Sequence, residues 1–134
     1  MAEKILLEIV TPEKKVLSES VDIVVAPGEL GEFGVLPGHI PFLCKLKIGE
    51  LRYRLGAASH HVAIMGGYAE VLNNQVTILA TAAEAATEID VVRAKAARER
   101  AERRISGAKD KLEFTRAQAA LQRAIARLKV AERQ

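Results

Sequence analysis

The chain has 134 residues, of which 49% are apolar and 28% are charged, a balance that is typical of a globular protein. No uncharged apolar run approaches the roughly 18 residues of a membrane-spanning helix, so we expect a soluble or peripheral protein. Glu3, Lys4 and Glu8 interrupt the apolar stretch that a secretory signal would need, which indicates a cytoplasmic protein. The single cysteine, Cys44, excludes an intramolecular disulfide, and its neighbours form no metal-ligand pattern.

The net charge of +3 conceals a division within the chain. Residues 1–88 contain seven Lys and Arg against eleven Asp and Glu, whereas residues 89–134 contain thirteen against six. This asymmetry predicts that the C-terminal part meets an anionic partner. A nucleotide, a nucleic acid and an acidic protein surface all fit that charge.

Short stretches rich in β-branched or alternating apolar residues follow one another between residues 4 and 80. Glycine and proline pairs such as Pro27-Gly28, Pro37-Gly38 and Gly66-Gly67 separate these stretches too often for long helices. Strands without a helical pattern between them predict an antiparallel β-sandwich. We therefore predict such a sandwich over residues 1–86, with strands at Lys4–Val10, Val21–Ala26, Leu51–Leu55, His61–Met65, Tyr68–Leu72 and Val76–Ala80.

Helix-forming residues dominate after residue 81, with no proline and one glycine before the end of the chain. Thr87 followed by Asp90 is typical of a helix N-cap, so we expect a first helix from about Ile89 to Ile105. Ser106-Gly107 is a helix stop, and a second helix is expected over Lys109–Arg133. The sequence therefore predicts an α+β chain, in which an antiparallel two-helix hairpin over residues 87–134 follows the sandwich.

The apolar stripes predicted on these helices are narrow and consist mostly of small residues. Two such helices bury too little apolar area to be stable alone, so the hairpin should need docking on the sandwich, a partner or a ligand. We expect it to be mobile. The stripes comprise Ala94, Ala97, Ala101 and Ile105 on the first helix, and Phe114, Ala117, Leu121, Ala124, Leu128 and Ala131 on the second.

Two stretches of the chain resemble a known family. Residues 28–43 read GELGEFGVLPGHIPFL and residues 89–104 read IDVVRAKAARERAERR. Both are similar to motifs of the epsilon subunits of bacterial F-type ATP synthases, and they stand in the same order. The order of domains, a β-domain and then two helices, is also the same.

The resemblance implies a non-catalytic rotor subunit of a proton-translocating ATP synthase. Such a subunit is fixed to the gamma shaft through its sandwich, sits on the ring of c subunits, and is peripheral to the cytoplasmic face of the bacterial inner membrane. The resemblance assigns Glu29, Glu32 and His39 to the contact with the c-ring. The alternative for these three residues is a solvated turn.

The resemblance also implies ATP as a regulatory ligand, with no cofactor required. Its motif Ile-Asp-x-x-Arg-Ala matches Ile89, Asp90, Arg93 and Ala94. Arginines could hold phosphate oxygens while the aspartate accepts from the adenine amino group. The alternative is a set of exposed salt bridges, each contributing about 0 to 1 kcal/mol. The implied ATP site consists of Glu84, Ile89, Asp90, Arg93, Ala94, Arg100, Arg123 and Arg127.

The thirteen Lys and Arg residues of the C-terminal part are more than one triphosphate can bind. The resemblance implies that the hairpin can extend towards the catalytic head and inhibit ATP hydrolysis through contacts with acidic segments of the alpha and beta subunits. The residues expected to make these contacts are Arg116, Arg123, Arg127 and Arg133.

Two other classes of function are disfavoured. An independent enzyme would need a Gly-rich phosphate loop, a nucleophile motif or metal-ligand spacing, and the sequence has none of these. A nucleic-acid-binding module would need a platform for base stacking, and Phe114 is the only aromatic residue after Tyr68. We therefore expect no metal and no nucleic acid as partners.

Overall fold

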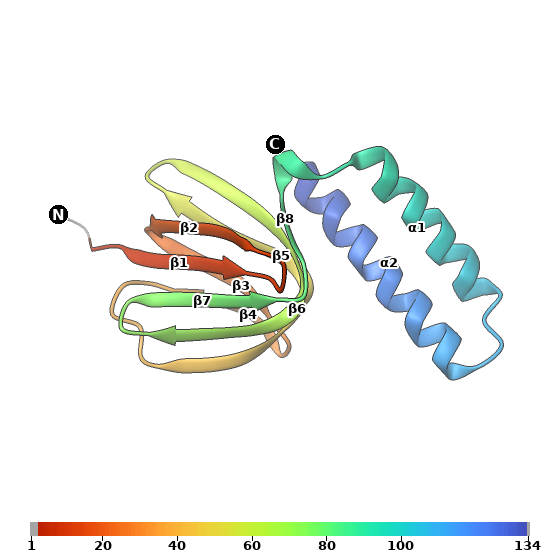
Figure 1. Cartoon of the computed structure of the whole chain (residues 1–134), viewed down its shortest axis with the longest axis horizontal. Coiled ribbons are helices and arrows are strands. Elements are labelled where there is room, and N and C mark those ends of the chain that lie inside the picture. Colours follow the sequence, from red (N-terminus) through yellow and green to blue (C-terminus); the bar gives the residue numbers. More distant parts are fainter. Residues whose placement is uncertain (1–2, 134) are drawn as a thin grey trace.

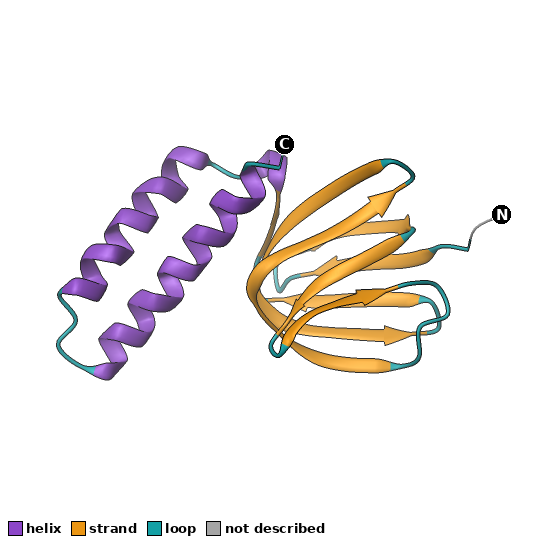
Figure 2. Cartoon of the chain, turned by 180° about the vertical axis from the view of Figure 1, so that it is seen from behind, coloured by secondary structure: helices purple, strands orange, loops and turns teal. Residues whose placement is uncertain are grey.

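The computed structural model describes residues 3–133 and shows a β-sandwich with a helical hairpin beside one end of it (Figure 1). The α+β prediction, a sandwich followed by two helices, is confirmed. Figure 2 shows the same arrangement from behind, with α2 between α1 and the sandwich. The elements are β1 (Ile5–Val10), β2 (Lys15–Val21), β3 (Ile23–Gly28), β4 (Gly31–Val35), β5 (Phe42–Leu55), β6 (Ala58–Leu72), β7 (Gln75–Ala80), β8 (Ala83–Ala85), the short 3-10 helix η1 (Ala86–Glu88), α1 (Val91–Ser106) and α2 (Lys111–Ala131).

The two long strands β5 and β6 connect the layers of the sandwich. The order of strands is β2-β1-β7-β6-β5-β3-β4, and β8 also pairs with β6. Strand β7 pairs with residues 67–72 of β6, whereas β8 pairs with residues 62–64. The two halves of β6 therefore have different neighbours. Among the described strands, the pair β1–β7 is parallel and the other pairs are antiparallel.

The core lies between the layers and follows from the alternation of apolar residues. In β1, Ile5, Leu7 and Ile9 are fully buried, while the residues between them are half-buried. The same buried cluster contains Val76 and Ile78 of the neighbouring β7 and Val24 of β3. Burial of each such side chain stabilises the fold by about 1.5 to 3 kcal/mol, so the sandwich has a complete core of its own.

Gly66-Gly67 was predicted to end a strand, and that prediction is wrong, because both residues lie inside β6. They have φ values of 75° and 129°. A Cβ atom on Gly67 would lie 2.0 Å from the carbonyl oxygen of Leu79. The glycines therefore permit a bend and a close approach of backbones, which let one strand serve both layers.

Other strand boundaries also differ from the prediction. Val21–Ala26 is not one strand, because the chain turns at Asp22, whose carboxylate accepts from Lys4 Nζ at 2.6 Å and from the Gly56 N–H at 2.7 Å. Strands β2 and β4, the first half of β5 and the short β8 were not predicted. Glycines within β4 and β5 concealed those two strands from a reading of sequence alone.

The N-cap of the first helix is Asp90, not Thr87 as predicted. Asp90 is the N-cap of α1 and accepts from the Arg93 N–H at 3.0 Å, while Asp110 caps α2 in the same way. The predicted stop is present, since α1 ends at Ser106 and Gly107 is its C-cap. The stripe on α2 was partly wrong, because Phe114 is exposed and the buried residues of that helix are Ala117, Ala124, Ala126 and Val130.

We predict that Gly67→Ala lowers the free energy of unfolding by about 3 kcal/mol, since the new methyl group would overlap the Leu79 carbonyl. Gly38→Ala is the matched control, because Gly38 also has a positive φ but no atom lies within 4 Å of the position that its Cβ would occupy. It should cost about 1 kcal/mol. Urea denaturation of both variants measures this, and equal losses would contradict the role of Gly67.

Candidate functional site

The hairpin is attached to the sandwich through a small apolar cluster, which we call the docking seam. It consists of Ala63 and Met65 of β6, Ile89 of the linker, and Ala126 and Val130 of α2, each less than 9% exposed. The seam joins the last two turns of α2 to the outer face of β6. Because it has only five buried side chains, two of them alanines, it stabilises the docked hairpin by only a few kcal/mol.

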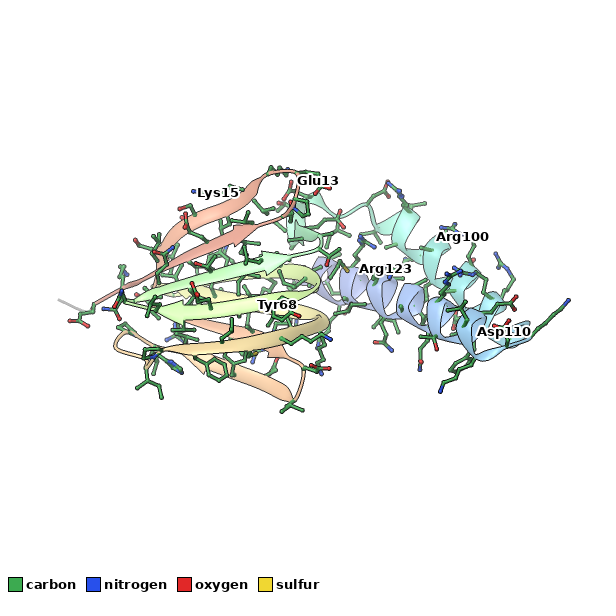
Figure 3. The ribbon with its side chains drawn as sticks, turned by 60° about the horizontal axis from the view of Figure 1, so that its bottom comes forward. Glu13, Lys15, Tyr68, Arg100, Asp110 and Arg123 are labelled. Atoms are coloured by element: carbon green, nitrogen blue, oxygen red, sulfur yellow. The ribbon has the colours of Figure 1, made fainter. Side chains whose placement is uncertain are left out.

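A cleft of about 460 Å³ lies between the two helices on the side of the linker. Seven of the eight residues expected to bind ATP line it. These are Glu84, Asp90, Arg93, Ala94, Arg100, Arg123 and Arg127. They come from β8, the N-cap of α1, α1 itself and the second half of α2. Arg100 lies on α1 and Arg123 on the facing helix (Figure 3).

The cleft carries a strong positive charge. Five arginine side chains line it against two carboxylates, and the fifth arginine, Arg104, was not predicted as a site residue. One end is fixed by an ion pair between Arg127 Nε and Glu84. The other carboxylate, Asp90, is partly used because its Oδ1 caps α1. Forked guanidinium donors around a cleft of this size suit a polyanion such as a triphosphate.

Three of the predicted hairpin residues lie away from the cleft, namely Ile89, Arg116 and Arg133. Ile89 is 7% exposed and packs in the docking seam, directly before the first turn of α1. Arg116 is exposed and lies in the first half of α2, closer to the tip of the hairpin than Arg123. Asp110, at the start of α2, marks that tip in Figure 3.

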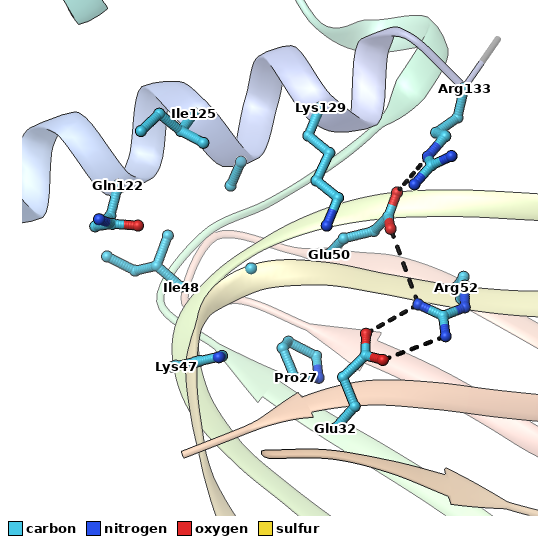
Figure 4. Close-up of a pocket in the computed structure, with 12 residues that line it drawn as sticks. Pro27, Glu32, Lys47, Ile48, Glu50, Arg52, Gln122, Ile125, Lys129 and Arg133 are labelled. Atoms are coloured by element: carbon cyan, nitrogen blue, oxygen red, sulfur yellow. Dashed lines mark hydrogen bonds and ion pairs between the residues drawn. The ribbon is translucent and has the colours of Figure 1, made fainter. Parts of the chain in front are cut away.

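A second cavity, of about 410 Å³, lies between α2 and the sandwich, and sequence reasoning missed it (Figure 4). Its centre is Glu50 of β5, whose side chain is 2% exposed. Glu50 Oε2 lies 3.1 Å from His61 Nδ1 and accepts from Arg133 Nε at 3.3 Å. Arg133 was predicted to contact the catalytic head, and in this structure it is bonded to the sandwich.

The three residues expected at the c-ring lie on separate loops and strands. Glu29 is in the β3–β4 turn beside the fully exposed Leu30. Glu32 is on β4, and both of its oxygens accept from Arg52, at 2.9 and 3.3 Å. These hydrogen bonds, together with the charges of Arg52, Lys129 and Lys47, lower the pKa of Glu32 below its ordinary value. His39 lies in the loop before β5, where its ring contacts Phe42 with centroids 6.0 Å apart.

The described part of the chain contains neither a metal-ligand group nor a helix that could span a membrane. Among residues 3–133, no three His, Cys, Asp or Glu side chains are grouped so that they could hold a metal ion. Within the same residues, neither helix is long and apolar enough to cross a membrane.

Comparison with known proteins covers nearly the whole chain. Residues 4–86 match the family model of the ATP synthase delta/epsilon chain beta-sandwich domain, and residues 87–132 match that of its long alpha-helix domain. The chain is 80% identical over 133 residues to the ATP synthase epsilon chain of Syntrophobacter fumaroxidans, covering 99% of each. It is 57% identical to that of Nitratidesulfovibrio vulgaris strain DP4, covering 97% of each.

Solved structures give the same result for the fold. A chain in the cryo-EM structure of the Euglena gracilis mitochondrial ATP synthase (OSCP/F1/c-ring) has a TM-score of 0.83 and 27% identity, with 98% of this chain and 83% of that chain covered. A chain of the Tetrahymena thermophila central stalk and c-ring structure has a TM-score of 0.59 at 16% identity, with 98% and 96% covered, and it supports the fold alone.

We predict that Arg52→Gln raises the pKa of Glu32, because the hydrogen bonds that hold its carboxylate ionised are lost. A carboxyl group whose folded-state pKa is lowered stabilises the fold above its unfolded pKa, and that contribution is lost as pH falls through the folded pKa. Carboxyl ¹³C NMR titration measures the shift. Glu8, whose pKa is lowered by Lys15, should be unaffected, and an unchanged Glu32 would contradict the assignment.

Proposed function

The chain belongs to the ATP synthase delta/epsilon chain family, and from this premise we propose that it is a non-catalytic rotor subunit in the central stalk of a bacterial F-type ATP synthase. The observation that carries the proposal is the match of both domains, in order, to the two family models. In this role the chain couples proton flow to ATP synthesis, binds the gamma subunit and the c-ring through its sandwich, and lies at the cytoplasmic face of the membrane through the complex. It performs no bond-breaking chemistry itself.

The β3–β4 turn and the neighbouring end of β5 are the proposed c-ring surface. Leu30 is fully exposed and Leu43 is 70% exposed, so apolar side chains stand beside the carboxylates of Glu29 and Glu32. A shallow hollow of about 430 Å³ separates the two segments. Exposed apolar groups bordered by charge are typical of a protein interface. His39 extends this surface along the loop before β5.

The cleft between the helices is the proposed site for ATP as a regulatory ligand. Arg93 and Arg100 from α1 and Arg123 from α2 face a common space, so a triphosphate bound there would join the two helices. Asp90 and Ala94 also line the cleft, and we propose that the second carboxylate oxygen of Asp90 accepts from the adenine amino group while Ala94 packs against the ring. Neutralising five neighbouring guanidinium groups would stabilise the folded hairpin.

Inhibition of ATP hydrolysis requires the hairpin in another position. In the docked hairpin Arg127 is paired with Glu84 and Arg133 with Glu50, so neither is free to meet the acidic segments of the alpha and beta subunits. Extension would release both, together with Arg116 and Arg123. Helix α2 alone spans about 32 Å, at 1.5 Å per residue, which allows contacts far from the sandwich. ATP would then shift the population towards the docked, uninhibited state, to the extent that it binds this state more tightly than the extended one.

We predict that ATP raises the thermal midpoint of the purified chain and that Arg93→Ala and Arg127→Ala abolish the rise. A ligand at a hundredfold excess over its Kd stabilises the state that binds it by about 2.7 kcal/mol. ADP should have a weaker effect, because it offers fewer phosphate oxygens to the arginines.

Arg116→Ala is the control for these variants, since Arg116 lies outside the cleft. The thermal midpoint of the Arg116→Ala chain should still rise with ATP. No change in midpoint at millimolar ATP would reject the nucleotide-sensing role. The assignment as a rotor subunit would stand, because it depends on the family match.

We predict that deleting residues 89–134 raises the ATP hydrolysis rate of the assembled complex at low ATP, because the inhibitory helices are removed. The sandwich keeps its own core, so assembly with the gamma subunit should persist. Hydrolysis assays on complexes with full-length and truncated chains measure the change. An unchanged rate would reject inhibition by the hairpin.

A further inference from the structure

A chain of four charged side chains connects the β3–β4 hairpin with the end of α2 (Figure 4). Glu32 of β4 is bonded to Arg52 of β5, with distances of 2.9 and 3.3 Å. Arg52 Nη1 lies 4.0 Å from Glu50 Oε1, and Glu50 Oε2 accepts from Arg133. The four residues run from the proposed c-ring surface to the docked hairpin, and neither Arg52 nor Glu50 lines the proposed nucleotide cleft.

Of these four side chains, Glu50 is the one whose loss of partners would cost the most free energy, because it is buried. Among residues 3–133 it is the one charged residue that is buried, at 5% exposure. A buried carboxylate needs hydrogen bonds and opposite charge to remain ionised at low cost. Two of its neighbours, His61 and Arg52, belong to the sandwich, whereas Arg133 belongs to the hairpin. Undocking the hairpin therefore removes one of these partners.

Arg52 can compensate for that loss only when Glu32 does not hold it. Residues 50 and 52 lie on the same face of β5, and Arg52 pairs in register with His61 of β6. The guanidinium is engaged at both ends by Glu32, and its distance from Glu50 exceeds that of a hydrogen bond. Arg52 Nη1 is already 4.0 Å from Glu50 Oε1, so an approach of about 1 Å would make a hydrogen bond between them.

We propose that Arg52 is a switch which couples occupation of Glu32 to release of the hairpin. When a cationic group of a partner protein binds Glu32, Arg52 turns to Glu50, takes the place of Arg133, and lowers the cost of undocking. When Glu32 is free, it retains Arg52, and Glu50 holds the hairpin through Arg133. Identifying that partner with the rotor ring rests on the proposed function, whereas the coupling is a property of the chain itself.

A direct attraction must be separated from this coupling. Lys129 of α2 and Lys47 of β5 border the same cavity and also lower the pKa of Glu32. Removing the charge of Glu32 would therefore weaken docking through Lys129 even if Arg52 took no part. The proposed coupling requires Arg52, whereas the direct attraction between Glu32 and Lys129 does not.

Hydrogen exchange of the isolated, ATP-free full-length chain, followed by NMR, tests the proposal. Protection of the α2 amides reports docking, and protection of the sandwich amides reports the fold. We expect Glu32→Gln to lower α2 protection about threefold, and Arg133→Gln, which leaves a buried carboxylate short of a partner, about tenfold. In an Arg52→Gln background, Glu32→Gln should have a clearly smaller effect, because only the attraction between Glu32 and Lys129 is then left to lose.

Glu29→Gln and Arg116→Gln are the matched controls, because each removes a similar exposed group outside the cavity, and both should leave α2 protection unchanged. If Arg52→Gln lowers the protection of the sandwich amides, the background variant is Arg52→Met instead of Arg52→Gln. A Glu32→Gln effect that is as large without Arg52 as with it, or no Glu32→Gln effect at all, would overturn the proposal. Neither result would bear on the family match or on the ATP titration, so the two proposals fail separately.

Discussion

The alanine-built packing of the hairpin is the constraint on which the rest of the structure depends. Helix α1 buries only Ala94 and Ala101, and α2 buries three alanines and Val130. Small side chains let the helices approach closely, but they release little free energy on burial, so two helices of 16 and 21 residues do not form a stable unit alone. The hairpin therefore depends on what it docks against, whereas the sandwich has a complete core and does not.

The same weakness gives the charged residues their influence. Five arginines share the cleft between the helices, and in the absence of an anion they repel one another across it. The docking seam is flanked by the Arg127–Glu84 pair on one side and the Arg133–Glu50 pair on the other. Each contributes modestly, yet in a hairpin held by a few kcal/mol a modest term is enough to change populations. A nucleotide in the cleft and a partner at Glu32 would thus act on one equilibrium from two sides.

Sequence periodicity was sufficient for the class of fold, because it depends on local spacing. The family resemblance gave four of the five arginines of the cleft and missed Arg104. The helical spacing of Arg93 and Arg100 places them on one face of α1, and the structure has both in the cleft. Glycines were misleading, since nothing local reveals that Gly67 lies against the Leu79 carbonyl. The Glu50–Arg133 bond joins residues 83 positions apart, and only the docking of α2 brings them together. Phe114 was placed in the stripe by its spacing, but that part of α2 lies beyond the sandwich.

The docked hairpin is proposed to be one of two states, and an anion in the cleft is proposed to select it. The distance between spin labels at Ala57, in the exposed β5–β6 turn, and Ser106, at the end of α1, reports this directly in a Cys44→Ser chain. We predict two distance populations without ATP, one for the docked hairpin and one for the released hairpin, and a single narrow population at the docked distance when ATP is saturating. A single distance distribution that is the same with and without ATP would contradict the two-state hairpin.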